Sequence, residues 1–237
     1  MKNCLICHGD VSSSFGWGAF LGLHKPNPVC EECERAFQKI TGELCRICGR
    51  EWEMVAPENR RKDLCSDCFR WEEDQSTAGL LQQNRSVYHY NDHMKDVLAK
   101  YKFRGDAVLA QVFRKAFLQS FETTWSKNLP IFVPIPLSAD RTYERGFNQS
   151  LFLAELLPGT PEELLFKSNS EKQSKKARKE RMERENSFYV PDPEPVKGKS
   201  ILLIDDIYTT GTTLRMAAKV LRDAGAKDIS SFTLVRS

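Results

Sequence analysis

Apolar residues follow two kinds of spacing from residue 87 to the end of the sequence. Short apolar or alternating runs predict strands at 87–90 (VYHY), 131–136 (IFVPIP), 188–190 (FYV), 201–204 (ILLI) and 229–237 (ISSFTLVRS). Segments with apolar residues every three or four positions predict helices at 91–103, 107–121, 150–157 and 214–226. Strands that alternate with helices predict an α/β fold, with a mostly parallel sheet and helices on both faces.

The N-terminal part of the chain is marked by its cysteines and not by a periodic apolar pattern. All eight lie in the first 68 residues, in four Cys-x-x-Cys pairs, and they are Cys4, Cys7, Cys30, Cys33, Cys45, Cys48, Cys65 and Cys68. Cys-x-x-Cys pairs with about 16 to 22 residues between them are typical of four-thiolate zinc sites, since two such pairs close one tetrahedral centre. We therefore expect two Zn²⁺ ions and a small N-terminal zinc-ribbon module.

The spacing leaves the pairing of the cysteines open. Sequential pairing places one ion on the first four cysteines and one on the last four, whereas interleaved pairing uses the same residues in other combinations. Four redox-active dithiols are a less favoured alternative. The expected organisation is a double zinc-ribbon module at 1–70, a linker at 71–86 and an α/β domain at 87–237.

The segment from Ile201 to Thr213, ILLIDDIYTTGTT, carries the clearest chemistry of the α/β domain. Asp205 and Asp206 follow a buried strand, and a hydroxyl-rich loop then leads into a helix. Backbone N–H groups at a helix N-terminus bind phosphate, and adjacent carboxylates bind sugar hydroxyls. The segment therefore predicts a ribose-phosphate site, with an ordinary strand-to-helix turn as the alternative. The loop residues are Thr209, Thr210, Gly211, Thr212 and Thr213.

Two arginines follow the strand at 131–136. Arg141 and Arg145 lie in the segment LSADRTYERGFNQS. In an open parallel sheet, the ligand binds outside the carboxyl ends of the strands, so both arginines are expected beside the same crevice as the acid pair. The alternative is a surface loop with solvated arginines.

The most polar segment is 167–186, KSNSEKQSKKARKERMEREN. It has no apolar stripe, so it buries little on folding, and a solvated helix or loop is the plain interpretation. The functional interpretation is a basic lid or a contact surface for a phosphate backbone. The candidate DNA-binding residues are Lys175, Lys176, Arg178, Lys179 and Arg181.

Composition narrows the class of protein. Hydrophobic residues make up 41% of the chain and charged residues 28%, as in soluble globular proteins, and no apolar run reaches the roughly 18–20 residues of a membrane span. The N-terminus has no apolar secretion signal, so a cytoplasmic protein is expected. The first 75 residues hold 10 basic and 13 acidic residues and the remainder 25 and 19, which gives the C-terminal part a mild preference for phosphate-bearing partners.

Several strings together resemble a known family. The segment 201–213 resembles the diphosphoribosyl-binding signature of type I phosphoribosyltransferases. With the cysteine pairs, YKFRGD (101–106), VPIPLS (133–138) and ERGFNQ (144–149), the chain resembles the ComF family of bacterial competence proteins, in its ComFC-like branch, over essentially its full length.

The resemblance implies roles for the residues of the signature. Asp205 and Asp206 would hold the ribose hydroxyls of phosphoribosyl pyrophosphate, and Thr209 to Thr213 would surround its 5-phosphate. The VPIPLS turn would face the pyrophosphate, with Mg²⁺ accompanying the ligand. In hypoxanthine-type salvage enzymes, an aspartate that assists at the base stands where this chain has Thr209, so binding is predicted more strongly than turnover.

The resemblance also implies a cellular role. A ComFC-like protein is expected to act in natural transformation, binding and handling incoming single-stranded DNA in the cytosol or at the inner face of the membrane through partners. Its implied partners are single-stranded DNA, a ComFA-type helicase and a DprA-type recombination mediator. The alternative function is an active phosphoribosyltransferase, in nucleotide salvage or nucleic-acid modification, with an acceptor that the sequence does not identify.

Overall fold

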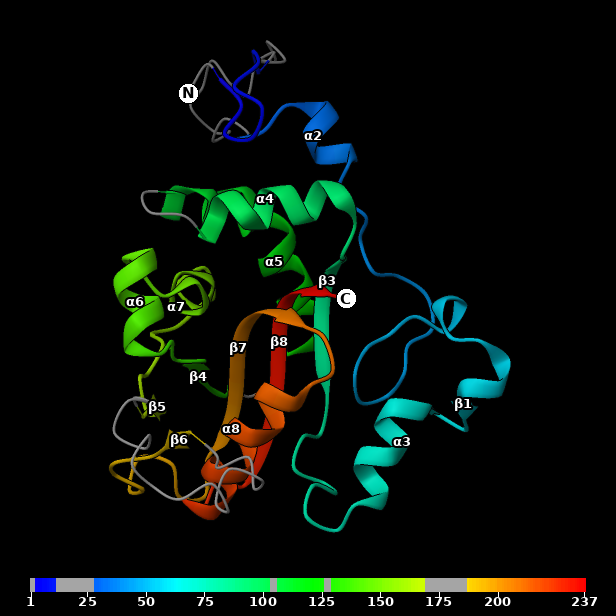
Figure 1. Ribbon diagram of the computed structural model, residues 1–237, viewed down its shortest axis with the longest axis vertical. Coiled ribbons are helices and arrows are strands. Elements are labelled where there is room, and N and C mark those ends of the chain that lie inside the picture. The colour runs from blue at the N-terminus through cyan, green and yellow to red at the C-terminus, as the bar shows by residue number, and fades with distance from the viewer. Residues whose placement is uncertain (1–2, 12–27, 103–105, 126–128, 169–186) are drawn as a thin grey trace, which may run out of the picture.

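A four-stranded parallel sheet forms the centre of the molecule (Figure 1). The computed structural model describes residues 3–11, 28–102, 106–125, 129–168 and 187–237. The strand order is β3-β8-β7-β4, and every neighbouring pair is parallel. The strands are β3 (Asn84–His89), β4 (Ile131–Pro134), β7 (Ser200–Tyr208) and β8 (Asp228–Arg236). The parallel sheet predicted from the alternation of strands and helices is confirmed.

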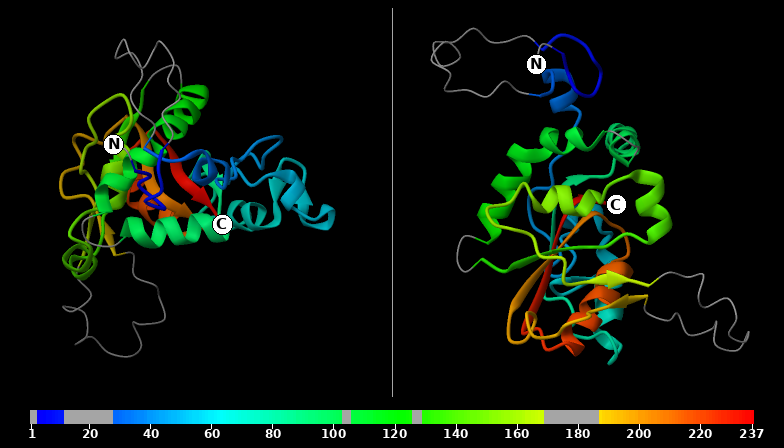
Figure 2. Two further views of the ribbon diagram at one scale, coloured as in Figure 1. Left: turned by 90° about the horizontal axis from the view of Figure 1, so that it is seen from above. Right: turned by 90° about the vertical axis from the view of Figure 1, so that its left-hand side faces the viewer.

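Helices cover both faces of this sheet (Figures 1 and 2). On one face, α5 packs Phe113, Phe117 and Phe121 against Phe232 of β8, together with α4 and α7. On the other face, α8 packs Leu214, Ala217 and Leu221 against Leu203 of β7. The helices are α4 (Asp92–Lys102), α5 (Ala110–Thr124), α7 (Gln149–Ala154) and α8 (Thr212–Asp223), with a short 3₁₀ helix η3 (Asp106–Leu109) before α5.

Helix α4 forms where its sequence predicts it. The side chain of Asn91 accepts a hydrogen bond from the backbone N–H of Met94 at 2.8 Å, which caps the helix start. The predicted apolar stripe, which includes Val97 and Tyr101, is buried against the sheet. The same stripe brings the last residue of α4, Lys102, towards the end of β7 that carries the acid pair.

Two differences between the structure and the sequence prediction affect the region around the acid pair. The segment after β4 contains a further helix, α6 (Ala139–Arg145), which begins with a Ser138 cap and ends at Gly146 with φ of 78°. Strand β7 continues four residues beyond Ile204, because its pairing with β8 extends to Tyr208. The carboxylates therefore lie within the strand and not after it.

The outer elements complete the described chain. The antiparallel pair β5 (Phe166–Lys167) and β6 (Phe188–Tyr189) flanks residues 169–186, which lie outside the description. In the predicted linker, α3 runs to Glu73 and β3 already begins at Asn84. The remaining N-terminal elements are α2 (Glu31–Arg35), η1 (Trp52–Met54), η2 (Pro57–Asn59), β1 (Arg60–Arg61), β2 (Leu64–Cys65) and α3 (Ser66–Glu73).

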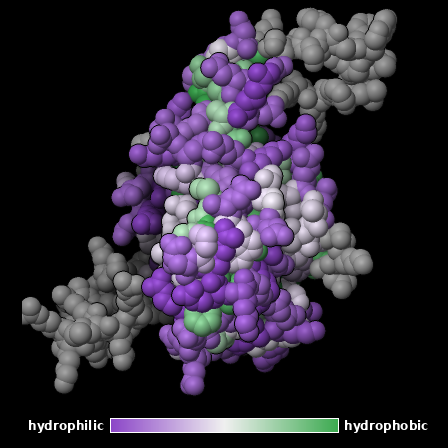
Figure 3. Space-filling model, turned by 90° about the vertical axis from the view of Figure 1, so that its right-hand side faces the viewer, coloured by the Kyte–Doolittle hydropathy of each residue, from purple (hydrophilic) through white to green (hydrophobic). Residues whose placement is uncertain are grey.

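None of the helices in the described ranges combines the length and the apolar character that a bilayer span requires. The surface on the side of α3 and β1 is mostly hydrophilic, with small separate apolar patches (Figure 3).

Phe117→Ala tests whether the α5 face is the principal core. Phe117 is fully buried and its ring stacks on Phe232 with centroids 4.3 Å apart, so truncation should lower the free energy of unfolding by about 3–5 kcal/mol. Urea denaturation measures this loss. Leu129→Ala, at a side chain that is 59% exposed, is the control and should change stability by less than about 0.5 kcal/mol. Similar losses in the two variants would contradict this assignment.

Candidate functional site

Three elements meet at the acid pair. Asp205 and Asp206 lie on β7, beside the N-terminus of α7 and the C-terminus of α4. The Asp205 carboxylate accepts hydrogen bonds from the Ser150 hydroxyl and from the backbone N–H of Asp206, both at 2.9 Å. The ammonium of Lys102 lies 2.5 Å from Oδ2 of Asp206. The site is therefore a carboxylate pair with its own cation.

The two carboxylates differ in electrostatic environment. Burial, and then the neighbouring charge of Asp206, raise the pKa of Asp205 to about 7. The hydrogen bonds from Asp206 N–H and Ser150, and the charge of Lys102, oppose this shift. Asp205 therefore takes up a proton more readily than a carboxyl group in water, while Asp206 faces the lysine.

The side chains of β7 change face at the acid pair. Leu202 and Ile204 pack into the core under α5, as alternation along a strand requires. Ile207, three residues after Ile204, packs against the same core, whereas Tyr208 lies in the core under α8. The alternation is thus interrupted at Asp205 and Asp206, two half-buried residues, while the strand remains paired to β8.

The loop after β7 ends in a helix start that has no side-chain cap. Gly211 is the N-cap residue of α8 and has no side chain to satisfy the first-turn N–H groups. The hydroxyls of Thr210 and Thr212 lie 2.8 Å apart at the same point, and both Thr210 and Thr213 are exposed. The N–H of Thr212 donates a long hydrogen bond to the Thr210 hydroxyl at 3.4 Å. A helix N-terminus of this kind, with hydroxyls beside its first-turn N–H groups, fits an anion such as phosphate.

Close packing explains the glycine at position 211. Its φ is 80°, and a Cβ there would lie 2.2 Å from the Tyr208 hydroxyl and 2.3 Å from Nη1 of Arg215. Any side chain would therefore push the loop away from α8.

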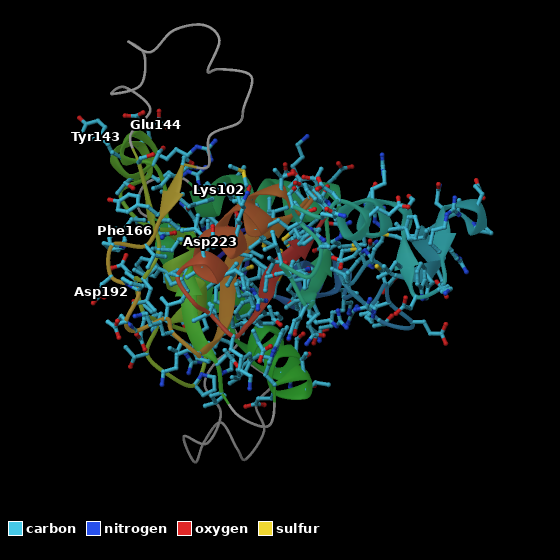
Figure 4. The ribbon with its side chains drawn as sticks, turned by 90° about the horizontal axis from the view of Figure 1, so that it is seen from below. Lys102, Tyr143, Glu144, Phe166, Asp192 and Asp223 are labelled. Atoms are coloured by element: carbon cyan, nitrogen blue, oxygen red, sulfur yellow. The ribbon has the colours of Figure 1, made fainter. Side chains whose placement is uncertain are left out.

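Arg141 and Arg145 both lie on α6 but differ in surroundings. Arg145 is half-buried and donates a hydrogen bond to the side-chain oxygen of Gln149 at 2.8 Å. Arg141 is exposed, and its charge, after burial, lowers the pKa of Lys167 on β5, whereas Asp205 opposes that shift. The charges of both Arg141 and Asp205 thus act on Lys167. Tyr143 and Glu144 lie at the outer side of this helix, away from the cysteine-bearing elements on the other side of the molecule (Figure 4).

The cysteines form two sets, each with sequential pairing. The sulfur atoms of Cys4, Cys7, Cys30 and Cys33 lie within 4.8 Å of one another, and so do those of Cys45, Cys48, Cys65 and Cys68. Cys7 and Cys30 sulfurs are 3.7 Å apart and those of Cys48 and Cys65 are 3.6 Å apart. A tetrahedral zinc with Zn–S bonds of about 2.3 Å requires sulfur separations of roughly 3.8 Å. We call the two sets the first and second cysteine clusters.

The two clusters are built in the same way. In each, the residue after the second cysteine is left-handed, His8 with φ of 62° and Gly49 with φ of 66°. Its N–H bonds the carbonyl of the first cysteine at 3.0 Å in both cases. Cys30 and Cys65 then cap the short helices α2 and α3. All four cysteines of the second cluster are buried, whereas Cys7 of the first is exposed.

Sequence reasoning missed three side chains of the site. Lys102 and Ser150, which contact the acid pair, lie in or next to the strings YKFRGD and ERGFNQ but had no assigned role. Gln149 is 1% exposed, and its amide nitrogen has no partner among the described residues. The DNA-binding candidates Lys175, Lys176, Arg178, Lys179 and Arg181 lie outside the described residues.

Comparison with known proteins finds a family profile that matches the C-terminal part of the chain and relatives that match nearly all of it. A family profile described as a phosphoribosyl transferase domain matches residues 156–237, which include the acid pair and the loop. Competence protein ComFC of Bacillus subtilis is 42% identical over 99% of this chain and 95% of its own. Competence protein ComFC of Streptococcus pneumoniae is 36% identical over 98% of this chain and 99% of its own. The DNA utilization protein YhgH of Salmonella typhi is 24% identical over 99% of this chain and 96% of its own.

Gly211→Ala tests the close packing of the loop. A left-handed alanine costs about 1–2 kcal/mol, and forced overlap with Tyr208 and Arg215 should add about 1–3 kcal/mol. Gly42→Ala is the matched control, because Gly42 has φ of 70° but nothing within 4 Å of an added Cβ. Chemical denaturation should show a larger loss for Gly211→Ala. An equal loss would show that backbone strain alone accounts for the glycine.

Proposed function

The chain belongs to the ComFC family of competence proteins, and we propose that it binds a phosphoribosyl pyrophosphate-type ligand while handling incoming single-stranded DNA in the cytosol. The observation that carries the ligand proposal is the junction of β7 and α8. There a carboxylate pair, held by Ser150 and Lys102, is followed at once by an uncapped helix N-terminus.

The chemistry of the junction fits the two halves of such a ligand. Asp205 and Asp206 offer acceptors for two ribose hydroxyls, and hydrogen bonds to a charged carboxylate are stronger than neutral ones. The first-turn N–H groups of α8 and the Thr210 and Thr212 hydroxyls offer donors for a 5-phosphate. Arg141, Lys102 and Lys167 supply positive charge where the pyrophosphate would lie.

The donor sets also fit the expected ions. Carboxylate oxygens are ligands that Mg²⁺ prefers, so Asp205 and Asp206 would hold the magnesium ion that accompanies the ligand, and the ion would offset the negative charge of the pyrophosphate. The two cysteine clusters supply soft thiolate ligands in closed sets of four, which suits structural zinc. In this proposal, residues 1–70 form the zinc module, 71–86 connect it, and 87–237 form the ligand-binding domain.

The DNA-handling part of the proposal rests on relatives and on charge. The relatives are named for competence and for DNA utilization. The basic run of residues 167–186 offers contacts for a phosphate backbone. The proposed protein partners remain a ComFA-type helicase and a DprA-type recombination mediator, with the zinc module as a docking part.

An active phosphoribosyltransferase is the second candidate function. The match of residues 156–237 to a phosphoribosyl transferase domain favours it. Thr209, in place of a carboxylate, supplies no acid–base group for a leaving base. Release of pyrophosphate from the ligand in the presence of nucleotides or single-stranded DNA would identify turnover, and binding without release would favour a binding protein.

Asp206→Asn tests the ligand site. The change removes the charge that Lys102 pairs with and one charged acceptor for a ribose hydroxyl. We expect affinity for phosphoribosyl pyrophosphate with Mg²⁺, measured by isothermal titration calorimetry, to fall roughly 10- to 100-fold.

The matched control is Asp223→Asn, at the last residue of α8. Asp223 is an exposed carboxylate at the far end of α8, about 16 Å from the loop at a rise of about 1.5 Å per residue (Figure 4). Its variant should bind like the wild type. Absence of binding heat in the wild type would rule out the ligand proposal.

Replacing Lys175, Lys176, Arg178 and Lys179 by glutamine tests the basic run. If these residues contact phosphates of single-stranded DNA, the slope of log affinity against log salt should fall by up to about 3, at roughly 0.7 for each lost contact. Fluorescence anisotropy with a labelled oligonucleotide over a salt series measures this slope.

The control replaces four exposed lysines outside the basic run, Lys95, Lys115, Lys199 and Lys227. It changes net charge equally, so a general electrostatic effect would lower the slope in both proteins. An unchanged slope in the first variant would exclude the basic run from DNA binding.

A further inference from the structure

Trp71 connects the second cysteine cluster to the loop that follows the acid pair. It lies on α3, three residues after Cys68, so the helix that carries a cluster cysteine also carries this indole. The indole N–H donates a hydrogen bond to the carbonyl of Thr210 at 3.1 Å. The carbonyl of Trp71 in turn accepts a hydrogen bond from the Thr77 hydroxyl at 2.7 Å, which fixes the end of α3.

Arg236 connects the same two parts from the other side. It is the last residue of β8, and its side chain is 4% exposed. One guanidinium nitrogen donates to the carbonyls of Tyr208 and Thr209, at 3.3 and 3.0 Å. The other lies 3.9 Å from the sulfur of Cys48. A single side chain thus bridges a cluster sulfur and the first carbonyls of the loop.

The Arg215 side chain lies against the rings of Trp71 and Tyr208, and the Tyr208 ring in turn lies against Arg236. Its guanidinium is 2% exposed, lies 4.8 Å from the centre of the Trp71 ring and donates to the Tyr208 hydroxyl at 2.9 Å. The Tyr208 ring also lies 4.8 Å from the guanidinium carbon of Arg236. Gly211 packs directly on Tyr208 and Arg215. The backbone from Thr209 to Gly211 therefore contacts the side chains of Trp71, Arg215 and Arg236, which lie beside the second cluster.

The net charge of the second cysteine cluster explains why arginine side chains are buried close to it. Four thiolates and one Zn²⁺ carry a net charge of about −2, and a buried charge of that size requires nearby cations. The Arg236 guanidinium contacts the Cys48 sulfur, and burial lowers the pKa of Arg85 while the charges of Cys45 and Cys48 oppose that shift. Within the described ranges, no aspartate or glutamate side chain forms an ion pair with Arg85, Arg215 or Arg236, although Arg236 also donates to the carbonyl oxygen of Ser237.

The first cysteine cluster has different surroundings. Cys4 and Cys33 pack into the core that contains Met94 and Val97 of α4, and the Lys100 ammonium donates to the carbonyl of Ile6 at 2.9 Å. Among the described residues, no hydrogen bond joins this cluster to the loop from Thr209 to Thr213.

We propose that the second cysteine cluster, when it holds its metal, fixes the phosphate-binding loop in the ligand-ready conformation through Trp71 and Arg236. Loss of the metal from this cluster then loosens the loop and lowers affinity for a phosphate-bearing ligand, whereas the first cluster has no such effect. The affinity part rests on the proposed function, but the loosening of the loop is a property of the ligand-free protein.

Hydrogen exchange of the full-length, metal-loaded protein tests this proposal without ligand. Trp71→Phe retains an aromatic ring but removes the nitrogen-bearing ring and its N–H. Peptides covering residues 209–214 should therefore exchange roughly fivefold faster, as expected for one lost hydrogen bond, and Trp52→Phe controls for the loss of ring volume. Arg236→Lys should have an effect of similar size, because a lysine cannot bridge the carbonyls and the Cys48 sulfur together.

Trp52→Phe and Arg60→Lys are the matched controls. Both lie in the same module and form their own cation–π pair, with 5.6 Å from the guanidinium carbon to the ring centre, but neither contacts the loop. Their peptides at 209–214 should exchange as in the wild type. A zinc assay with a colorimetric chelator should find two ions per chain in all four variants.

Cys48→Ala and Cys7→Ala separate the two clusters. Each should lose one zinc ion, and only Cys48→Ala should speed exchange at residues 209–214. If Cys48→Ala does not fold, the Trp71 and Arg236 variants decide the question alone. Wild-type exchange in both of those variants, or equal acceleration in the controls, would overturn the proposal.

Calorimetry with phosphoribosyl pyrophosphate and Mg²⁺ then tests the consequence for binding. Trp71→Phe and Arg236→Lys should bind several-fold more weakly than wild type, with zinc retained. If the wild type does not bind this ligand, the proposed function fails, and the exchange result still decides whether the cluster supports the loop. Unchanged affinity together with unchanged exchange would refute the coupling itself.

Discussion

The pairing of β7 with β8 beyond Ile204 is the interaction on which the site depends. It continues from Asp205 opposite Thr233 to Tyr208 opposite Arg236, so the acid pair and the start of the loop are held as strand backbone. That pairing also places Arg236 beside the carbonyls of Tyr208 and Thr209. A strand that ended at Ile204 would leave the same residues in a free loop, without fixed directions for the carboxylates.

Charged side chains are buried or half-buried on both sides of β7. On the α4 side, Lys102 pairs with Asp206, while burial and the Asp206 charge raise the pKa of Asp205. On the α8 side, buried arginines lie between the second cysteine cluster and the loop. Because isolated buried charges are costly, each group requires its partner, and the two sides are coupled through a few residues of β7.

These features distinguish binding from turnover. The carboxylate pair, its lysine and the uncapped helix N-terminus are all suited to hold a sugar phosphate. Where the resemblance to phosphoribosyltransferases implies a base-assisting aspartate, this chain carries the hydroxyl of Thr209. In our proposal, the second cysteine cluster supports the loop through Trp71 of α3 and through Arg236, which is a structural contribution and not a chemical one.

The sequence by itself determined the parallel sheet, the phosphate motif and the four cysteine pairs, because each depends on local spacing along the chain. It placed Asp205, Asp206 and the loop in order, but it ended the strand too early and missed α6. Only the tertiary structure decided that the cysteines pair sequentially and that Lys102, Ser150 and Arg236 reach the site. These side chains come from other parts of the chain, and contacts across more than 50 residues leave no periodic signal in the sequence.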